Sequence, residues 1–194
     1  MIDSFLIMCY NMCLLRVFIL LLIIKIDEGV DAMKEKMKNL VITNYCSTDK
    51  RKYRFIHEVK EDPLIRDFVS PNIEQYLNDS EGVSRLKVGP AYIIADQRKL
   101  VGFIRLATLN LNGVLNLHYG VHPSFRKQHY GTKILVETGS YLFQSMPDVK
   151  KIELYIHERN TGSLGCASNA CFQFDREFYD KDGLSLTKVY SRNL

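Results

Sequence analysis

The sequence has few cysteines and no pattern that would pair them. Five of its 194 residues are cysteine, an odd number, and no two of them form a C-x-x-C pair. This argues against both a disulfide framework and a zinc knuckle, and we expect no metal site. Unpaired thiols are typical of a reducing compartment, so we expect a cytoplasmic protein.

Excess charge, internal repeats and low-complexity linkers are also missing. The net charge is only +4, which does not indicate a nucleic-acid partner, and we expect none. A hydrophobic fraction of 46% with 25% charged residues is typical of a globular domain and excludes a disordered or collagen-like chain. The length suits a single domain with a sizeable core.

Residues 1–32 form a hydrophobic leader that differs from the main domain, residues 33–194. The run over 5–24 contains 20 residues and is apolar except for Asn11 and Arg16. That length just suffices to cross a bilayer, although an arginine at the centre of such a helix costs about 2.5–3.5 kcal/mol. A secretory signal fits poorly, because no basic residue precedes the run and no A-x-A-like cleavage site follows it.

Two interpretations of the leader stay open. Three lysines follow it closely, so an inserted helix would leave the main domain anchored to the membrane on its cytoplasmic side. Alternatively, the leader is a non-native extension and translation starts at Met33 or Met37. A membrane partner is therefore expected only if residues 5–24 act as an anchor.

The rest of the chain alternates between strand and helix patterns. Apolar and β-branched runs predict strands, and apolar residues at helical spacing predict helices. Pro63 and Pro71 break the first helical region into short helices. Strands are expected at 39–45, 91–96, 100–109, 114–121, 151–157, 172–179 and 184–192, and helices within 50–69 and at about 71–78, 131–145 and 160–170.

This order of elements predicts a mixed α/β domain, of the α+β kind, built on one central sheet. Asn112-Gly113 and Asp182-Gly183 predict tight turns between neighbouring strands. In the strand at 151–157, apolar residues at every second position predict one buried and one polar face.

The segment between the strand at 114–121 and the next helix carries the clearest sign of a binding site. It reads V-H-P-S-F-R-K-Q-H-Y-G-T over residues 121–132. Such a junction presents free backbone N–H groups at the positive end of the helix dipole, which suits an anion. Arg126 and Lys127 add charge suited to phosphate, and Gly131 permits close backbone approach. A basic surface loop has the same composition, so the residues alone leave both interpretations open.

The same segment resembles the acyl-CoA loop of the GNAT superfamily of N-acetyltransferases, V-x-P-x-x-R-x-x-G-x-G/A followed by an amphipathic helix. Val121, Pro123, Arg126 and Gly131 are in register with this pattern. About thirty residues later, the stretch N-T-G-S-L starting at Asn160 resembles the N-x-x-S/A-I segment of the family. The resemblance implies a single GNAT-like domain with a mixed, mostly antiparallel sheet flanked by helices.

The resemblance also implies acetyl-CoA as co-substrate, bound in a cleft where the strands at 114–121 and 151–157 splay apart. Pantetheine would hydrogen-bond to the backbone near Tyr119 and Val121. Asn160 and Ser163 would lie near the thioester, with Ser163 as proton donor to the leaving thiolate. The diphosphate would rest on the segment made of Arg126, Lys127, Gln128, His129, Tyr130, Gly131 and Thr132.

Several positions depart from the family pattern. His129 replaces the first loop glycine, and Cys171 stands where the family has the glycine of a Gly-Phe pair. Asn116 occupies the strand position where a glutamate often acts as base. Because this residue is not a glutamate, the usual base is missing. Ala167 stands where one subgroup carries a tyrosine that acts as general acid.

His118 is our candidate for that base. It shares a strand face with Asn116 because side chains alternate along a strand, and its imidazole accepts protons near neutral pH. Glu153 and Tyr155, which share a face of the neighbouring strand, are weaker candidates.

The expected function is transfer of an acetyl group from acetyl-CoA to a primary amine, on a protein N-terminus or a small molecule, by direct attack. His118, Ser163 and Asn160 are the catalytic candidates. The alternative is a regulatory module that binds acyl-CoA but has lost catalysis. Acetyl-CoA and an amine acceptor are the expected partners, and a homodimer is left open.

Overall fold

The computed structural model describes residues 40–44, 49–78, 91–181 and 183–194, all within the unit Leu40–Leu194. The hydrophobic leader, with both interpretations of it, lies outside the described residues. Among those that are described, no helix combines the length and the apolar character that a membrane span requires.

Strands and helices follow one another along this part of the chain. The first half contains β1 (Leu40–Asn44), α2 (Lys50–Val59), α3 (Pro63–Phe68), α4 (Ile73–Asn78), β2 (Ala91–Asp96), β3 (Lys99–Leu109) and β4 (Val114–Val121). A 3₁₀ turn (Pro123–Phe125) follows. The second half contains α5 (Tyr130–Ser145), β5 (Lys151–His157), α6 (Thr161–Asn169), β6 (Gln173–Tyr179) and β7 (Leu186–Asn193).

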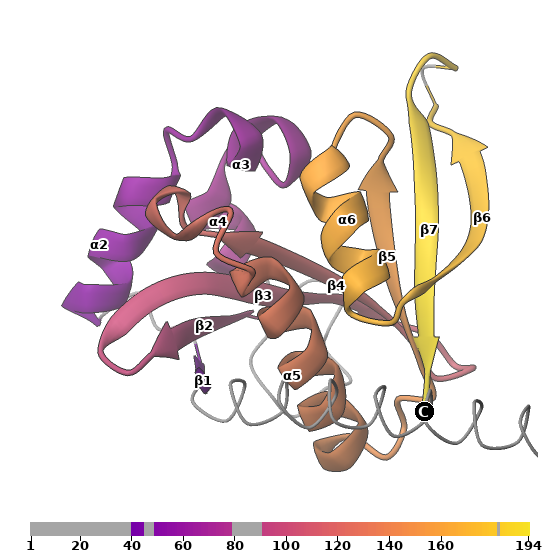
Figure 1. Ribbon diagram of the computed structural model, residues 1–194, viewed down its shortest axis with the longest axis horizontal. Coiled ribbons are helices and arrows are strands. Elements are labelled where there is room, and N and C mark those ends of the chain that lie inside the picture. The colour runs from indigo at the N-terminus through magenta and orange to yellow at the C-terminus, as the bar shows by residue number, and fades with distance from the viewer. Residues whose placement is uncertain (1–39, 45–48, 79–90, 182) are drawn as a thin grey trace, which may run out of the picture. The chain divides into compact units, whose positions relative to one another are not determined.

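The strands form one sheet in the order β1-β2-β3-β4-β5-β7-β6 (Figure 1). The first four are antiparallel neighbours, and of these β2, β3 and β4 follow one another directly as a meander. β5 then joins β4 in parallel, and α5 provides the crossover that a parallel neighbour requires. β7 lies between β5 and β6 and is antiparallel to both. The mixed, mostly antiparallel sheet predicted from the sequence is confirmed.

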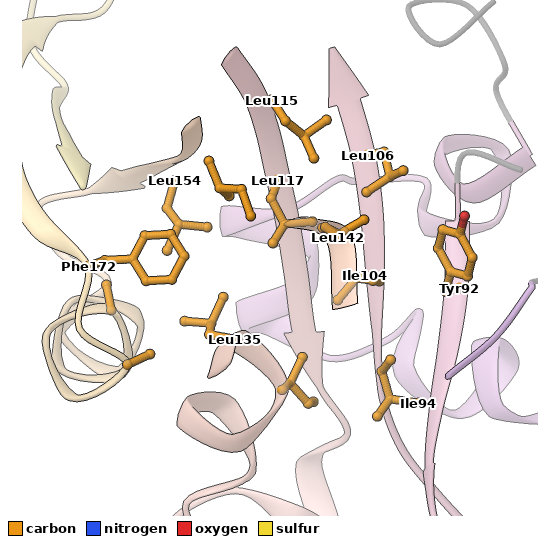
Figure 2. Packing of buried hydrophobic residues seen from close by; sticks show 14 of the residues in the cluster. Tyr92, Ile94, Ile104, Leu106, Leu115, Leu117, Leu135, Leu142, Leu154 and Phe172 are labelled. Carbon is orange, nitrogen blue, oxygen red and sulfur yellow. The ribbon is translucent and has the colours of Figure 1, made fainter. Parts of the chain in front are cut away.

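Two hydrophobic clusters lie on opposite faces of this sheet. On one face, Ile134 and Leu142 of α5 belong to the same cluster as apolar side chains from strands β2 to β5 and from α6 (Figure 2). On the other face, α2, α3 and α4 pack over β2 and β3, with Phe103 of β3 completely buried among them. Helices thus cover β2 and β3 from both sides, which explains why these strands are apolar almost throughout.

Local signals in the sequence account for most element boundaries. Pro63 begins α3 rather than only ending α2, and the Asp62 side chain caps that helix by accepting the N–H of Ile65. Gly113 adopts a left-handed φ of 78° at the predicted turn before β4. In β5, Ile152, Leu154 and Ile156 are buried as predicted. The predicted turn at residues 182 and 183 lies partly outside the described residues.

Candidate acyl-CoA and acceptor site

The parallel strands β4 and β5 are paired over only three residues of each. The pairing begins where both strands begin and ends at Asn116 opposite Glu153. β4 continues to Val121 while staying paired with β3, and β5 continues to His157 while staying paired with β7. Beyond Asn116, the backbone groups of β4 that point toward β5 are therefore not used by that strand. The divergence lies where the family resemblance implies the cleft.

The loop that leaves β4 has an unusual backbone. Lys127 and His129 both adopt left-handed φ values, 59° and 63°. Left-handed residues next to ordinary ones turn successive N–H groups to one side, which makes a concave site for an anion. Lys127, Gln128 and His129 are exposed, and the Gln128 side chain donates a hydrogen bond to the carbonyl of Ser124 at 3.0 Å.

Helix α5 begins without a side-chain cap. His129 is its N-cap residue and makes no capping hydrogen bond. Lys133 donates its N–H to the carbonyl of His129, as an ordinary helix amide does. The N–H groups of Tyr130, Gly131 and Thr132 come too early in the helix to have an intrahelical partner. These free N–H groups form the positive end of the helix dipole, so this terminus is suited to bind phosphate.

Two residues of the predicted diphosphate segment direct their side chains to other parts of the protein. The hydroxyl of Tyr130 donates to Asp96 of β2 at 2.7 Å, and this bond raises the pKa of Tyr130 to about 12. The guanidinium of Arg126 makes two hydrogen bonds to Asp62, at 2.9 and 2.6 Å. Burial raises the pKa of Asp62, but the bonds from Arg126 and from the Ile65 N–H outweigh it and hold that pKa below its usual value. The charge of Arg126 is thus already balanced within the protein.

Gly131 is required by packing between two helices. A Cβ atom on this residue would lie 2.5 Å from the Sγ of Cys166 in α6 and 3.6 Å from the Tyr119 ring. Its small size therefore serves the contact of α5 with α6, and the expected approach of its backbone to the diphosphate stays a prediction. Thr132, next in the helix, is buried, and Val121 packs against the larger hydrophobic cluster.

Asn160 and Ser163 lie together at the start of α6. The Asn160 side chain is the N-cap and accepts the N–H of Ser163 at 3.1 Å. The carbonyl of Ser163 in turn accepts the hydroxyl of Tyr119 from β4, at 3.5 Å. This bond joins α6 to the diverging part of β4, and burial raises the pKa of the Tyr119 hydroxyl above its usual value. Asn160 therefore has a structural function in addition to any contact with the thioester.

His118 and Asn116 lie on the face of the sheet covered by α2, α3 and α4. The Nδ1 atom of His118 is hydrogen-bonded to the hydroxyl of Tyr76, which comes from α4. Burial lowers the pKa of His118, so its imidazole is neutral at pH 7 and able to accept a proton. The side-chain oxygen of Asn116 is buried and has no hydrogen-bond partner among the described residues.

Glu153, one of the weaker base candidates, is held in ion pairs. Arg176 of β6 donates two hydrogen bonds to its carboxylate, at 3.0 and 2.9 Å, and Lys151 lies 3.0 Å away. The bonds from Arg176 lower the pKa of Glu153 to about 2, which makes it a poor base. The other weak candidate, Tyr155, is 43% exposed. The partial burial that remains is the main cause that raises the pKa of its hydroxyl.

The structure adds four residues that sequence patterns alone did not assign to the site: Asp62, Tyr76, Cys166 and Arg176. Asp62 is 64 residues from its partner Arg126, and Tyr76 is 42 residues from His118. The dipeptide Asp62-Pro63 is a recognisable helix start. A single sequence gives no signal that Asp62 contacts Arg126 or that Tyr76 contacts His118.

Comparison with known proteins identifies the family and the fold. The chain matches the family model of the acetyltransferase (GNAT) domain over residues 39–173. No curated protein matches the sequence. A GNAT-family acetyltransferase from Bacillus anthracis has a similar fold, with a TM-score of 0.66, 14% identity and coverage of 80% of this chain and 95% of that one.

Two further solved structures are similar. A ribosomal L7/L12 α-N-protein acetyltransferase in complex with coenzyme A has a TM-score of 0.65 and 14% identity, covering 81% of this chain and 95% of that one. AAC(6')-Ib, an aminoglycoside acetyltransferase, in complex with paromomycin and acetyl-CoA has a TM-score of 0.62 and 16% identity, covering 80% and 94%. The fold predicted from the sequence is thus confirmed. Since the family model spans most of the chain, this protein belongs to the GNAT acetyltransferase family.

Proposed function

We propose that this protein transfers the acetyl group of acetyl-CoA to a primary amine, on a protein N-terminus or a small molecule, by direct attack. The observation that carries the proposal is the divergence of β4 from β5 beside the uncapped N-terminus of α5. An open strand edge suits the amide-containing arm of coenzyme A, and free helix amides suit its diphosphate. Two of the solved structures described above are complexes with coenzyme A or acetyl-CoA.

The backbone is the main binding surface for acetyl-CoA in this proposal. Tyr119 and Val121 offer peptide groups along the open edge of β4 to the two amides of pantetheine. The amides from Lys127 to Thr132 hold the diphosphate. Arg126 supports the loop through its pair with Asp62 and acts on the phosphates only at a distance. Because backbone groups do this work, the side chain of His129 in place of a glycine is compatible with binding.

The reaction needs a base on the acceptor side. The nitrogen of the neutral amine attacks the thioester carbonyl carbon, so that a C–N bond forms and the C–S bond breaks. His118, which is neutral because burial lowers its pKa, takes the proton that the amine loses. The thiolate of coenzyme A takes a proton from the hydroxyl of Ser163, which regains one from water. Asn160 holds the first turn of α6, and with it Ser163, in place.

A binding module without catalysis is the second candidate. Two residues of β4 and β5 favour this candidate. Asn116 replaces the usual carboxylate, and the charge of Glu153 is neutralised by Arg176 and Lys151. Such a protein would bind acetyl-CoA and leave every amine unchanged.

Two measurements test the proposal. Thermal unfolding with millimolar acetyl-CoA should show stabilisation, because a ligand that binds only the folded state raises its stability. Release of free coenzyme A should then appear with at least one member of a panel of peptides and small amines. No stabilisation would refute both candidates, and stabilisation without turnover would favour the binding module.

Replacement of the base tests the mechanism. His118→Gln should lower kcat/KM by about 100-fold or more, within the usual range for a general base, while leaving the stabilisation by acetyl-CoA unchanged. His57→Gln, at an exposed position of α2, is the matched control. Equal turnover by the two variants would remove His118 from the mechanism.

We also propose that the domain works in the cytoplasm, either free or tethered there by residues 5–24. Fractionation of cells that express the full chain, beside a chain starting at Met37, tests the tether. An anchor predicts that only the full chain sediments with membranes. Sedimentation of the purified Met37 chain alone would reveal a homodimer.

A further inference from the structure

The planes of the His118 imidazole and the Tyr76 phenol are nearly parallel. Their ring planes differ by 7° and their centroids are 5.8 Å apart, while the hydroxyl of Tyr76 is hydrogen-bonded to Nδ1. The N–H bonds and lone pairs of imidazole lie in the plane of the ring. Nearly parallel rings are compatible with a hydrogen bond between the hydroxyl of Tyr76 and Nδ1.

Tyr76 is held in this position by both its helix and the sheet. It lies in α4 between Ile73 and Leu77, both of which are buried. From the sheet, the guanidinium carbon of Arg105 lies 4.3 Å from the centroid of the Tyr76 ring. Arg105 is also the residue of β3 directly opposite His118. The phenol is thus a fixed partner for the histidine.

Among the residues that the structure describes, few charged or titratable groups face His118. Arg105 does so from β3 and Tyr76 from α4. From the neighbouring strand β5, Glu153 lies opposite Asn116, which precedes His118 by two residues in β4. The carboxylate of Glu153 is paired with Arg176. In the described part of the chain, the only hydrogen bond of the His118 ring is the one to Nδ1. Nε2 is therefore the nitrogen left for a substrate.

The direction of the bond to Tyr76 decides what Nε2 can do. If the hydroxyl of Tyr76 donates to Nδ1, the neutral imidazole carries its hydrogen on Nε2, which then cannot accept a proton. If Nδ1–H donates to the phenol oxygen, Nε2 keeps its lone pair and acts as a base.

We propose that Tyr76 is a positioning residue that accepts the hydrogen of Nδ1 and so fixes His118 as the tautomer with a free lone pair on Nε2. The inference rests on the role of His118 as base in the proposed function. A residue of α4 thus decides which ring nitrogen of His118, in β4, carries the hydrogen. The tautomer itself is a property of the folded protein without substrate.

The tautomer is measured directly by nitrogen NMR of protein labelled with ¹⁵N-histidine at pH 7.5. The signals of His118 are assigned by their loss in His118→Gln. We expect its Nδ1 to carry hydrogen and its Nε2 to be unprotonated. In Tyr76→Phe, which keeps the ring but removes the oxygen, we expect the hydrogen to move to Nε2. A wild-type protein with hydrogen on Nε2, or a phenylalanine variant that keeps it on Nδ1, would overturn the proposal.

Activity provides the second readout. Tyr76→Phe should lower kcat about tenfold, less than loss of the base itself, with the KM for acetyl-CoA unchanged. Tyr53→Phe, an exposed tyrosine of α2, is the matched control and should change neither parameter. Unchanged kcat in Tyr76→Phe would count against the positioning role. If no amine is turned over by the wild-type protein, the proposed function fails while the NMR result still decides the tautomer.

Discussion

The two helices that follow the diverging strands begin in opposite ways. Helix α6 follows β5 and is capped by the side chain of its N-cap residue, because Asn160 accepts the N–H of Ser163. Helix α5 follows β4 and begins at His129, whose left-handed backbone brings no side-chain cap to the first amides. A terminus that caps itself stabilises the fold, whereas one that stays open can bind an anion from outside. Of this neighbouring pair, only α5 is suited to hold phosphate.

The contact between these helices gives the largest expected effect. Gly131→Val should destabilise the protein by about 2 to 3 kcal/mol, because its Cβ would meet the Sγ of Cys166. Urea unfolding measures this change. Gly165→Ala in α6 is the matched control: a Cβ there meets nothing within 4 Å, and alanine should add stability by roughly 1 kcal/mol. Equal effects of the two substitutions would contradict the packing role of Gly131.

The helices also differ in their response to pH. Glu137 lies in α5, whereas α6 has no acidic or basic residue. Burial raises the pKa of Glu137 from 4.5 to about 7, although the charge of Lys133 and a backbone hydrogen bond from Leu40 oppose this rise. Its stabilising contribution is complete below pH 4.5 and is lost as pH rises to about 7, because the unfolded chain ionises first.

Glu137→Gln should therefore gain about 1 to 2 kcal/mol relative to the wild type between pH 4 and pH 8. Unfolding free energies of both proteins across this range provide the measurement. Glu177→Gln, on exposed β6, is the control that should show no such difference. A constant difference between Glu137→Gln and the wild type would show that Glu137 ionises normally in the folded state.

Giving α5 an acidic cap should remove the contrast between the helices. His129→Asp places a carboxylate at the amides that we assign to the diphosphate, and should weaken acetyl-CoA binding about tenfold, equivalent to roughly 1.4 kcal/mol. Calorimetric titration with acetyl-CoA measures the affinity. His129→Gly is the control, because glycine adopts the left-handed backbone without cost and keeps the amides open. Unchanged affinity in the aspartate variant would place the diphosphate elsewhere.

Removing the cap of α6 should have the smallest effect. Asn160→Ala should cost about 1 kcal/mol of stability, as is typical for an N-cap. Thermal unfolding checks this, and Asn160→Asp, which can still accept the N–H of Ser163, should retain most of the stability. A stable alanine variant that loses turnover would instead assign Asn160 to the chemistry.

Local patterns were sufficient to predict most strands and helices, whereas the GNAT-like arrangement of the sheet was implied by the family resemblance. The apolar runs of β2 and β3, the alternation in β5 and the turn at Gly113 each depend on residues close together in the chain, and these predictions are confirmed. The segment that resembles the acyl-CoA loop is also short and contiguous, and its assignment to the cofactor stays a prediction.

Side-chain roles at the site were less predictable, because their partners come from distant elements. The sequence assigned Arg126 to phosphate, but it could not indicate that Asp62 would neutralise the guanidinium. Glu153 was considered as a base, but Arg176 makes it a weak one. Tyr76 was not considered at all. Each of these contacts depends on how strands and helices pack, which no spacing in one sequence encodes.

The brief pairing between β4 and β5 has a consequence for how the chain folds. β2, β3 and β4 are consecutive antiparallel neighbours joined by short turns, whereas β1 pairs with β2 across α2, α3 and α4, and β5 pairs with β4 across α5 and with β7 beyond α6 and β6. Contacts between distant segments form more slowly, because more chain entropy is lost before they add stability. We therefore expect β2, β3 and β4 to be structured in the folding transition state, and β1 and β5 to join them later. On that route, the gap between β4 and β5 is where two separately formed parts of the sheet meet.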